Sequence, residues 1–425
     1  MTPPFPPIEL PIIDATIRMF TEPTLQGDIS LLQKIHDDEQ LSKNERLYDL
    51  NVSEKDLAST TKFKALLEAE GVEVEMKEGK NGPIPALAKT DPFMQELLED
   101  EDDRIRSLAE ARIDVKSTIT STRSARLLEM AERGALCIYL NYCGAHTRRW
   151  SGGDSLNFQN LTRRSDLRRS LQAPDGYLIA APDQSQGECR LLNWLAGQDD
   201  VVDRFRRGED PYLPVTSSIY NRTITADMPE RQVGKVVELA CGYGMGVKKL
   251  ERVMRNAKIE FDPSLPFRGV NAYRATHPAV VRLWKNANAI FEELSLKRSF
   301  TWEIFKGKDG LIYHPNGTWL DYRGLRWKEG EWRLYRGDRY RKMYGAKLVE
   351  NIVQWLSRIV TAEAIVRYRQ EGYQVVGMAH DDCWLLIPDD GVDRHSQIAA
   401  IMAQTPEWAP GLPLASEVKI GRTYQ

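Results

Sequence analysis

One stretch, residues 177–190 with the sequence YLIAAPDQSQGECR, constrains the fold of this chain more than any other. Five of the six residues before Asp183 have the composition of a buried β-strand, which Gly176 precedes and Pro182 ends. The strand delivers the carboxylate of Asp183 to its tip, and Glu188 follows before an apolar, helix-like run. Because Asp is common at strand ends in α/β proteins, this stretch alone predicts a strand–turn–helix unit and no particular chemistry.

A second stretch, MAHDDCWLLIP at residues 378–388, supplies two more carboxylates. Apolar segments lie on both sides of His380, Asp381 and Asp382. This pattern is typical of a β-hairpin whose tight turn carries polar residues. We therefore expect Asp381 and Asp382 at the turn of a hairpin.

A third stretch, ERQVGKVVELACGYGMG at residues 230–246, has the spacing of a helix face. Arg231, Lys235, Leu239 and Tyr243 recur at intervals of four, and each such step drifts only about 40° around a helix. All four side chains would share one broad face. The glycines that flank Tyr243 would end or distort the helix there.

One class of reaction uses all three stretches. In two-metal phosphoryl or nucleotidyl transfer, carboxylates hold two divalent ions about 3.5–4 Å apart, one for the attacking oxygen and one for the leaving oxygen. Cations such as Arg231 and Lys235 suit a triphosphate, and Tyr243 offers a flat surface for a base. The three stretches together predict a nucleotidyl transferase.

The same motifs resemble those of a known family. DQSQGECR resembles the DYSQIELR signature of family A DNA polymerases, RQVGKVVELACGYG resembles their fingers-helix signature, and HDD resembles their HDE hairpin. GAHTRRWSGGDSLNFQNL, at residues 144–161, resembles the segment with which the family grips the primer–template. The four motifs follow the family's order along the chain. Short sequence segments such as ELACGYGMG are similar to those of its bacteriophage members.

The resemblance implies an α+β, right-hand polymerase fold with an antiparallel palm sheet, a helical thumb and helical fingers. Residues 1–26 begin with a proline-rich stretch, from which we expect an extended N-terminal lead-in. The boundaries that the resemblance implies are the thumb at 27–132, the palm at 133–194 and 301–425, and the fingers at 195–300. Within the second palm segment, Asn316-Gly317 between alternating segments predicts a β-hairpin insertion at about 310–340.

The resemblance also implies the catalytic residues. Asp183 and Asp381 would bind two Mg²⁺ ions, for which Mn²⁺ can substitute, and Asp382 would assist as a weaker or more distant ligand. Lys235 would protonate the leaving pyrophosphate. The residues implied to bind the nucleotide are Arg231, Lys235, Tyr243, Glu188, Leu239, Gln186 and Tyr212, among which Glu188 would act as a steric gate against a 2′-OH.

Implied DNA contacts lie in three places: the grip segment, the acidic hairpin and the amphipathic stretch at 345–360. They are Arg149, Gln159, Asn160, His380, Glu350, Asn351 and Gln354. A structural histidine is an equal alternative for His380, and plain surface is an equal alternative for Glu350, Asn351 and Gln354. At Arg148 the family usually has Gly, and at Leu239 it usually has an aromatic residue. The resemblance therefore carries over neither the loop geometry at 148 nor the discrimination at the sugar 3′ carbon.

Composition and charge say little about whether the chain binds nucleic acid. The net charge is −3, but 58 basic residues can be segregated from 61 acidic ones, and basic runs at 163–169 and 333–347 suit a groove that follows phosphates. An exposed basic surface is the alternative. The N-terminus lacks a signal-peptide pattern, and no apolar run approaches the roughly 18–20 residues of a membrane span. We expect a cytoplasmic protein, in the host cell if it is viral, without a membrane partner.

The expected substrates are primer–template DNA and dNTPs, in DNA replication. A single-subunit phage-type RNA polymerase shares the catalytic scheme, but Glu188 argues against it. A non-catalytic DNA-binding replication factor is a second alternative, against which the complete set of Asp, Lys, Arg and Tyr residues argues. The chain begins about 25 residues before the first thumb-like helix, so we expect no proofreading exonuclease in it. A separate exonuclease or other replication proteins are compatible with the sequence as partners.

Overall fold

The computed structural model describes residues 5–79, 82–116, 119–154, 156–337 and 339–424. The chain divides into two compact units. The first unit comprises residues 1–23, 137–160 and 173–422, and the second comprises residues 24–136, 161–172 and 423–425. Within the described residues, no helix combines the length and the apolarity that crossing a bilayer requires.

The second unit is mainly helical. Its helices are α2 (Ile29–Asp49), α3 (Glu54–Ala58), α4 (Thr60–Ala69), α5 (Pro92–Leu98), α6 (Asp103–Lys116), α7 (Ile119–Arg133) and α8 (Asp166–Arg169). Two short antiparallel pairs join β1 (Gln26–Gly27) to β6 (Leu171–Gln172), and β2 (Met76–Gly79) to β3 (Gly82–Pro85). Leu57, Phe63, Leu67 and Leu108 are fully buried in its core. The helices predicted over 27–132 are therefore present.

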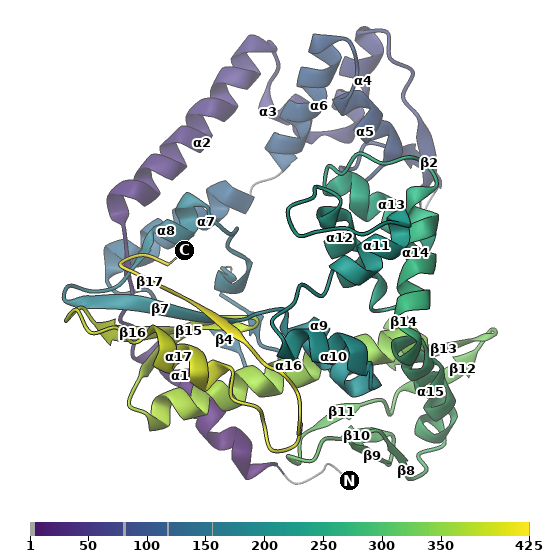
Figure 1. The fold of residues 1–425 in the computed structure, drawn as a ribbon. Helices are drawn as coiled ribbons and strands as arrows, with labels where there is room; N and C mark the ends of the chain where they lie inside the picture. Colours follow the sequence, from purple (N-terminus) through teal and green to yellow (C-terminus); the bar gives the residue numbers. More distant parts are fainter. Residues whose placement is uncertain (1–4, 80–81, 117–118, 155, 338, 425) are drawn as a thin grey trace. The chain divides into compact units, whose positions relative to one another are not determined.

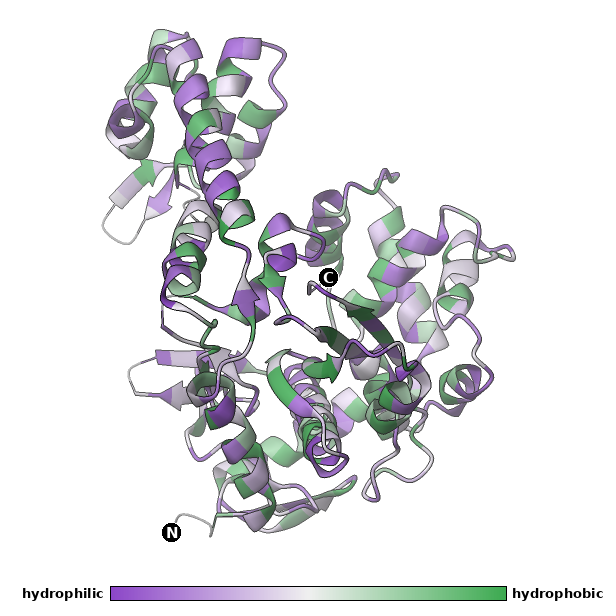
Figure 2. Cartoon of the chain, turned by 90° about the vertical axis from the view of Figure 1, so that its left-hand side faces the viewer, coloured by the Kyte–Doolittle hydropathy of each residue, from purple (hydrophilic) through white to green (hydrophobic). Residues whose placement is uncertain are grey.

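The first unit is built on a four-stranded antiparallel sheet with the strand order β15-β16-β7-β17. The strands are β7 (Tyr177–Gln184), β15 (Gln374–Ala379), β16 (Asp382–Pro388) and β17 (Ser416–Gly421). Helices α1 (Leu10–Thr21), α16 (Gly345–Gln370) and α17 (His395–Met402) pack on this sheet (Figure 1). Residues Cys383–Ile387 of β16 are all buried, and the strands near the C-terminus are among the most apolar elements in Figure 2. Strand β7 is thus an interior strand of the sheet, paired with β16 on one side and β17 on the other.

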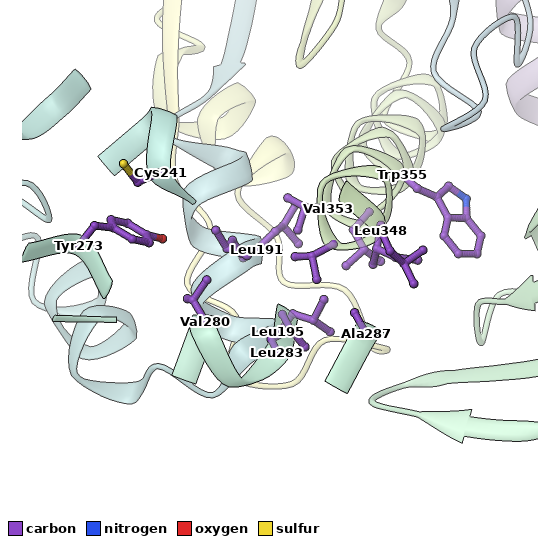
Figure 3. Packing of buried hydrophobic residues seen from close by; sticks show 14 of the residues in the cluster. Leu191, Leu195, Cys241, Tyr273, Val280, Leu283, Ala287, Leu348, Val353 and Trp355 are labelled. Atoms are coloured by element: carbon purple, nitrogen blue, oxygen red, sulfur yellow. The ribbon is translucent and has the colours of Figure 1, made fainter. Parts of the chain in front are cut away.

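A layer of helices follows β7 in the same unit. It comprises α9 (Gly187–Ala196), α10 (Asp199–Arg206), α11 (Leu213–Tyr220), α12 (Arg231–Cys241), α13 (Val247–Asn256), α14 (Leu265–Thr276) and α15 (Pro278–Ser295). Leu191, Val280 and Leu283 from this layer join Leu348 and Val353 of α16 in one apolar cluster (Figure 3). Helix α12 lies very close to α11, because a Cβ added at Gly234 would be 1.6 Å from Thr216 Oγ1.

The β insertion is larger than the hairpin predicted at 310–340. The predicted hairpin exists as β10 (Leu311–Tyr313) and β11 (Trp319–Asp321), with Asn316 and Gly317 in its turn. It belongs to a four-stranded sheet with β8 (Phe300–Trp302) and β9 (Phe305–Lys308), and a three-stranded sheet follows, made of β12 (Leu325–Lys328), β13 (Glu331–Arg336) and β14 (Arg339–Met343). The turn signal Asn316-Gly317, on which the prediction rested, identifies only the hairpin of β10 and β11.

The N-terminal segment differs from the extended lead-in expected at 1–26. A 3₁₀ turn at Pro7–Glu9 leads directly into α1, which spans Leu10–Thr21. Proline is compatible with the first turn of a helix, where its missing N–H would have no partner in any case. Ile12, Ala15 and Met19 give α1 a buried face at helical spacing. The expectation failed because the prolines were taken as evidence against a helix.

Candidate functional site

The predicted carboxylates from distant parts of the chain lie at neighbouring strand ends. In the antiparallel pair of β16 and β7, Asp382 is the register partner of Asp183. The backbone N–H of Gln184 also donates to the carbonyl of Asp381 at 3.3 Å. The turn at 380–381 therefore lies beside the tip of β7, although about 200 residues separate them in sequence.

The two carboxylates of the hairpin have different surroundings. Asp382 is only 7% exposed, and its Oδ1 accepts hydrogen bonds from Ala379 N at 2.9 Å and from Trp384 Nε1 at 3.0 Å. Asp381 is partly exposed, and His380 before it is exposed, with φ at +58°. Asp382 thus stabilises the turn, and the turn leaves the side chain of Asp381 partly exposed to solvent.

The residues at this strand end fit a magnesium site that uses few protein ligands. Mg²⁺ is commonly bound by one or two carboxylates, while water and substrate phosphates fill its other positions. Asp183 and Asp381 are both partly exposed and lie on adjacent strand ends. In the described part of the chain, no group of three or more His, Cys, Asp or Glu side chains is placed to hold a metal ion. Two partly exposed carboxylates match the number of protein ligands that such a magnesium site uses.

Helix α12 has the amphipathic character that the spacing predicts. Lys235 and Leu239 are exposed and Arg231 is partly exposed, whereas Val233 and Val237 face the core. The cationic side chains thus form the solvent face of the helix. The helix ends at Cys241, close to the predicted position.

The predicted nucleotide-binding residue Tyr212 is buried, with 3% of its surface exposed. The guanidinium of Arg231 lies 5.3 Å from the centre of its ring and also forms an ion pair with Asp210. Burial, followed by the nearby acidic groups, raises the pKa of Tyr212 to about 12. In this structure the ring of Tyr212 packs against the guanidinium of Arg231.

Glu188 joins three elements of the first unit. Its Oε2 accepts a hydrogen bond from Tyr243 Oη at 2.7 Å, and its Oε1 forms an ion pair with Arg149. Burial, with the Glu188 carboxylate adding to it, raises the pKa of Tyr243 well above its usual value. The start of α9, the C-terminal end of α12 and the grip segment are thereby held together at one carboxylate.

The other residues predicted to contact nucleotide or DNA differ in how far they are exposed to solvent. Gln186 is exposed at the start of α9 with φ at +50°, and Asn160 is also exposed. Gln159 is buried. On α16, Glu350 pairs with Lys347 at 2.8 Å, Asn351 is buried, and Gln354 is partly exposed. The structure therefore presents only some of these side chains to solvent.

Arg190, the last residue of the DQSQGECR motif, was not among the predicted site residues. Its Nε donates to Ser185 O at 2.8 Å, its Nη1 donates to Pro413 O at 2.8 Å, and its guanidinium lies 4.2 Å from the ring centre of Phe205. Arg190 thus fixes the turn between Asp183 and α9. An arginine inside an apolar helical run was the available signal, because a buried cation needs such partners.

A buried ion pair was also missed. Glu9 and Arg358 are 0% and 1% exposed, and two parallel hydrogen bonds of 2.7 Å and 2.6 Å join the guanidinium to the carboxylate. Tyr142 Oη donates to Glu9, and the Arg358 guanidinium lies 4.8 Å from the ring centre of Trp150. Burial raises the pKa of Glu9, but Arg358 and Tyr142 outweigh it and hold that pKa below its usual value. The N-terminal segment is thereby fixed to α16 and to the grip segment.

Comparisons with known proteins identify the family of this chain. A family model described as DNA polymerase family A matches residues 30–295, a range that ends before the acidic turn. The DNA polymerase of Bacillus phage SP02 is 30% identical over 281 residues, which cover 60% of this chain and 42% of that protein. The thermostable DNA polymerase I of Thermus thermophilus is 24% identical over 343 residues, or 80% of this chain and 36% of that protein.

The fold has a solved counterpart in the POL domain of Pol1 from M. smegmatis, determined in complex with a DNA primer–template and a dNTP. The likeness has a TM-score of 0.73 at 17% identity and covers 98% of this chain and 70% of that chain, which confirms the predicted right-hand α+β fold. The chain spans about two-fifths of the length of the curated relatives. Since the family model matches more than half of the residues, this chain belongs to DNA polymerase family A.

Proposed function

We propose that this chain is a template-directed DNA polymerase that adds dNTPs to a primer 3′-OH during DNA replication. The observation that carries the proposal is the register of β7 and β16, which brings Asp183 and the turn at 380–382 to one strand end. Membership of the family supports the same activity. Primer–template DNA and dNTPs are the proposed substrates, and a separate exonuclease or other replication proteins are compatible partners.

The proposed catalytic roles are those that the resemblance implies, and the exposure of the residues is compatible with them. Asp183 and Asp381 would hold two Mg²⁺ ions, or Mn²⁺ in their place, which supply Lewis-acid activation of the attacking and leaving oxygens. Asp382 keeps the turn in shape through its bonds to Ala379 and Trp384. Lys235, exposed on α12, is the proposed donor of a proton to the leaving pyrophosphate.

Arg231 on the same face would neutralise phosphate charge, and Asp210 and Tyr212 set its position. Tyr243 would stack on the incoming base, and Glu188 holds it by its hydroxyl. These contacts constrain the nucleotide-binding face before substrate arrives, which is the arrangement that favours catalysis by positioning.

We also propose the domain assignment that the resemblance implies. Residues 27–132 would be the thumb, 195–300 the fingers, and 133–194 with 301–425 the palm. The separate apolar core within residues 50–115 supports the first assignment. The sheet that combines β7 with β15, β16 and β17 supports the last.

The test of the function is extension of a primed template by the purified protein, with dNTPs and rNTPs compared. We expect extension with dNTPs and inefficient use of rNTPs. Efficient use of rNTPs would favour the RNA polymerase alternative, and DNA binding without extension would favour the non-catalytic factor. The expected absence of proofreading stays a prediction.

The steric-gate role of Glu188 predicts that Glu188→Ala raises the use of rNTPs relative to dNTPs by at least about tenfold, because the obstruction at the sugar 2′ position is removed. Glu188→Gln is the matched variant. It keeps the size of the side chain and the hydrogen bond from Tyr243 but weakens the pair with Arg149. Single-nucleotide incorporation kinetics should show that Glu188→Gln retains discrimination. Equal discrimination by Glu188→Ala and the wild type would exclude the gate.

A further inference from the structure

The backbone of the grip segment takes a left-handed conformation at Arg148, with φ at +59°. Two backbone hydrogen bonds close this turn, from Arg148 N to Ala145 O at 3.0 Å and from Ala145 N to Arg149 O at 3.1 Å. Glycine adopts this conformation without strain, whereas a residue with a Cβ is rarely found there. Arg148 thus keeps the geometry expected for glycine and adds a cation to it.

The side chain of Arg148 stacks on the β insertion. Its guanidinium lies 5.1 Å from the ring centre of Trp319 in β11. Stacking on an aromatic face orients a guanidinium and leaves its N–H groups available, because the contact uses the plane of the cation. Among the described residues, the structure shows no hydrogen bond or ion pair from this guanidinium, and its buried Nε lacks an acceptor.

Two acidic groups in this region already have partners. Glu9, whose carboxylate interacts electrostatically with Arg148, is bonded by Arg358 and Tyr142. Asp321, two residues after Trp319, pairs with Arg323. The neighbouring Arg149 is neutralised by Glu188, so Arg148 is the arginine of this turn that retains its charge for an external anion.

The insertion contacts the grip segment at a second position. His146 contacts Arg336 of β13, and its ring packs edge-on against Tyr322, with ring centres 5.1 Å apart. Burial, followed by the charge of Arg336, lowers the pKa of His146 to about 4, so it is neutral at pH 7. Tyr322 Oη in turn accepts a hydrogen bond from Asn351 Nδ2 at 2.9 Å. The insertion therefore contacts the grip segment at His146 and, through Tyr322, holds Asn351 of α16, which the resemblance implies as a DNA contact.

We propose that Arg148 binds a backbone phosphate of the primer–template and that Trp319 holds its guanidinium in place for this contact. The inference rests on the proposed polymerase function and adds a DNA contact that a glycine could not make. A guanidinium suits a phosphate because its donors match two oxygens at once. Such a contact positions DNA without selecting a sequence, as a polymerase requires.

The experiment measures binding of a primer–template duplex by fluorescence anisotropy across a salt series. Arg148→Gly should relieve the backbone strain, so its melting temperature should not fall. Its affinity should drop several-fold, and the slope of log K against log salt should decrease by about 0.9, the value for one lost phosphate contact. Trp319→Leu should weaken binding in the wild type but have no further effect in Arg148→Gly. Arg18→Ala, which removes an exposed cation of α1, is the control for net charge.

An unchanged slope in Arg148→Gly would overturn the inference, as would an equal decrease in Arg18→Ala. Additive effects of Trp319→Leu and Arg148→Gly would overturn the role given to Trp319. Failure of the wild type to bind primer–template DNA would instead overturn the proposed function itself. The two failures are therefore distinguishable in one series of measurements.

Discussion

Replacement of Asp381 by Asn should reduce primer extension by at least about a thousandfold while primer–template binding is retained. A neutral amide oxygen is a poor ligand for a hard divalent cation, and metal activation contributes several kcal/mol to such reactions, at about 1.4 kcal/mol for each factor of ten. Asp381 is a partly exposed turn residue, so the fold should tolerate the change. Single-turnover incorporation, measured beside duplex binding and the melting temperature, checks each part of this expectation.

The neighbouring carboxylates give this experiment its controls. Asp183→Asn should lose activity as Asp381→Asn does. Asp382→Asn should also lower the melting temperature, because its carboxylate accepts hydrogen bonds from Ala379 and Trp384. Asp389→Asn, just beyond the other end of β16, should match the wild type. Extension by Asp381→Asn at a rate near that of the wild type would contradict the assignment of the metal site.

The elements of the candidate site were predictable because their signals are local. The apolar segments around residues 380–382 form a hairpin, and Arg231, Lys235 and Leu239 lie on one helix as expected, whereas Tyr243 follows the end of that helix at Cys241. Alternation, helical spacing and turn residues are properties of a few consecutive residues. The proximity of Asp183 to the turn has no such signal, and it followed from the resemblance together with the chemistry of two-metal transfer.

What the sequence did not reveal depends on contacts between distant segments. The partners Glu9 and Arg358 are 349 residues apart, and nothing near either residue indicates the other. The burial of Tyr212 beneath Arg231 is another such feature, because the packing of the surrounding helices decides it. The stacking of the Arg148 guanidinium on Trp319 likewise joins two distant elements, and nothing in the local sequence indicates it.

The buried pair of Glu9 and Arg358 leads to the largest expected effect on stability. Glu9→Gln keeps the size of the side chain but leaves the buried guanidinium without a counter-charge, and such a loss costs about 3–5 kcal/mol. The N-terminal turn, α16 and the grip segment share this pair, so DNA binding should weaken as well. Chemical denaturation of the full chain measures the loss. Glu22→Gln, which breaks an exposed pair with Arg18, should cost only about 0–1 kcal/mol.

The pH dependence separates the charge of Glu9 from its packing. Its pKa lies below the usual value in the folded protein, so its stabilising contribution is present above the unfolded-state pKa of about 4.3 and is lost as the pH falls through the folded-state pKa. Glu9→Gln should therefore differ most from the wild type near neutral pH, and the two should converge in acid. A constant difference between them down to low pH would show that the lost stability comes from packing, because protonation of Glu9 would then change nothing.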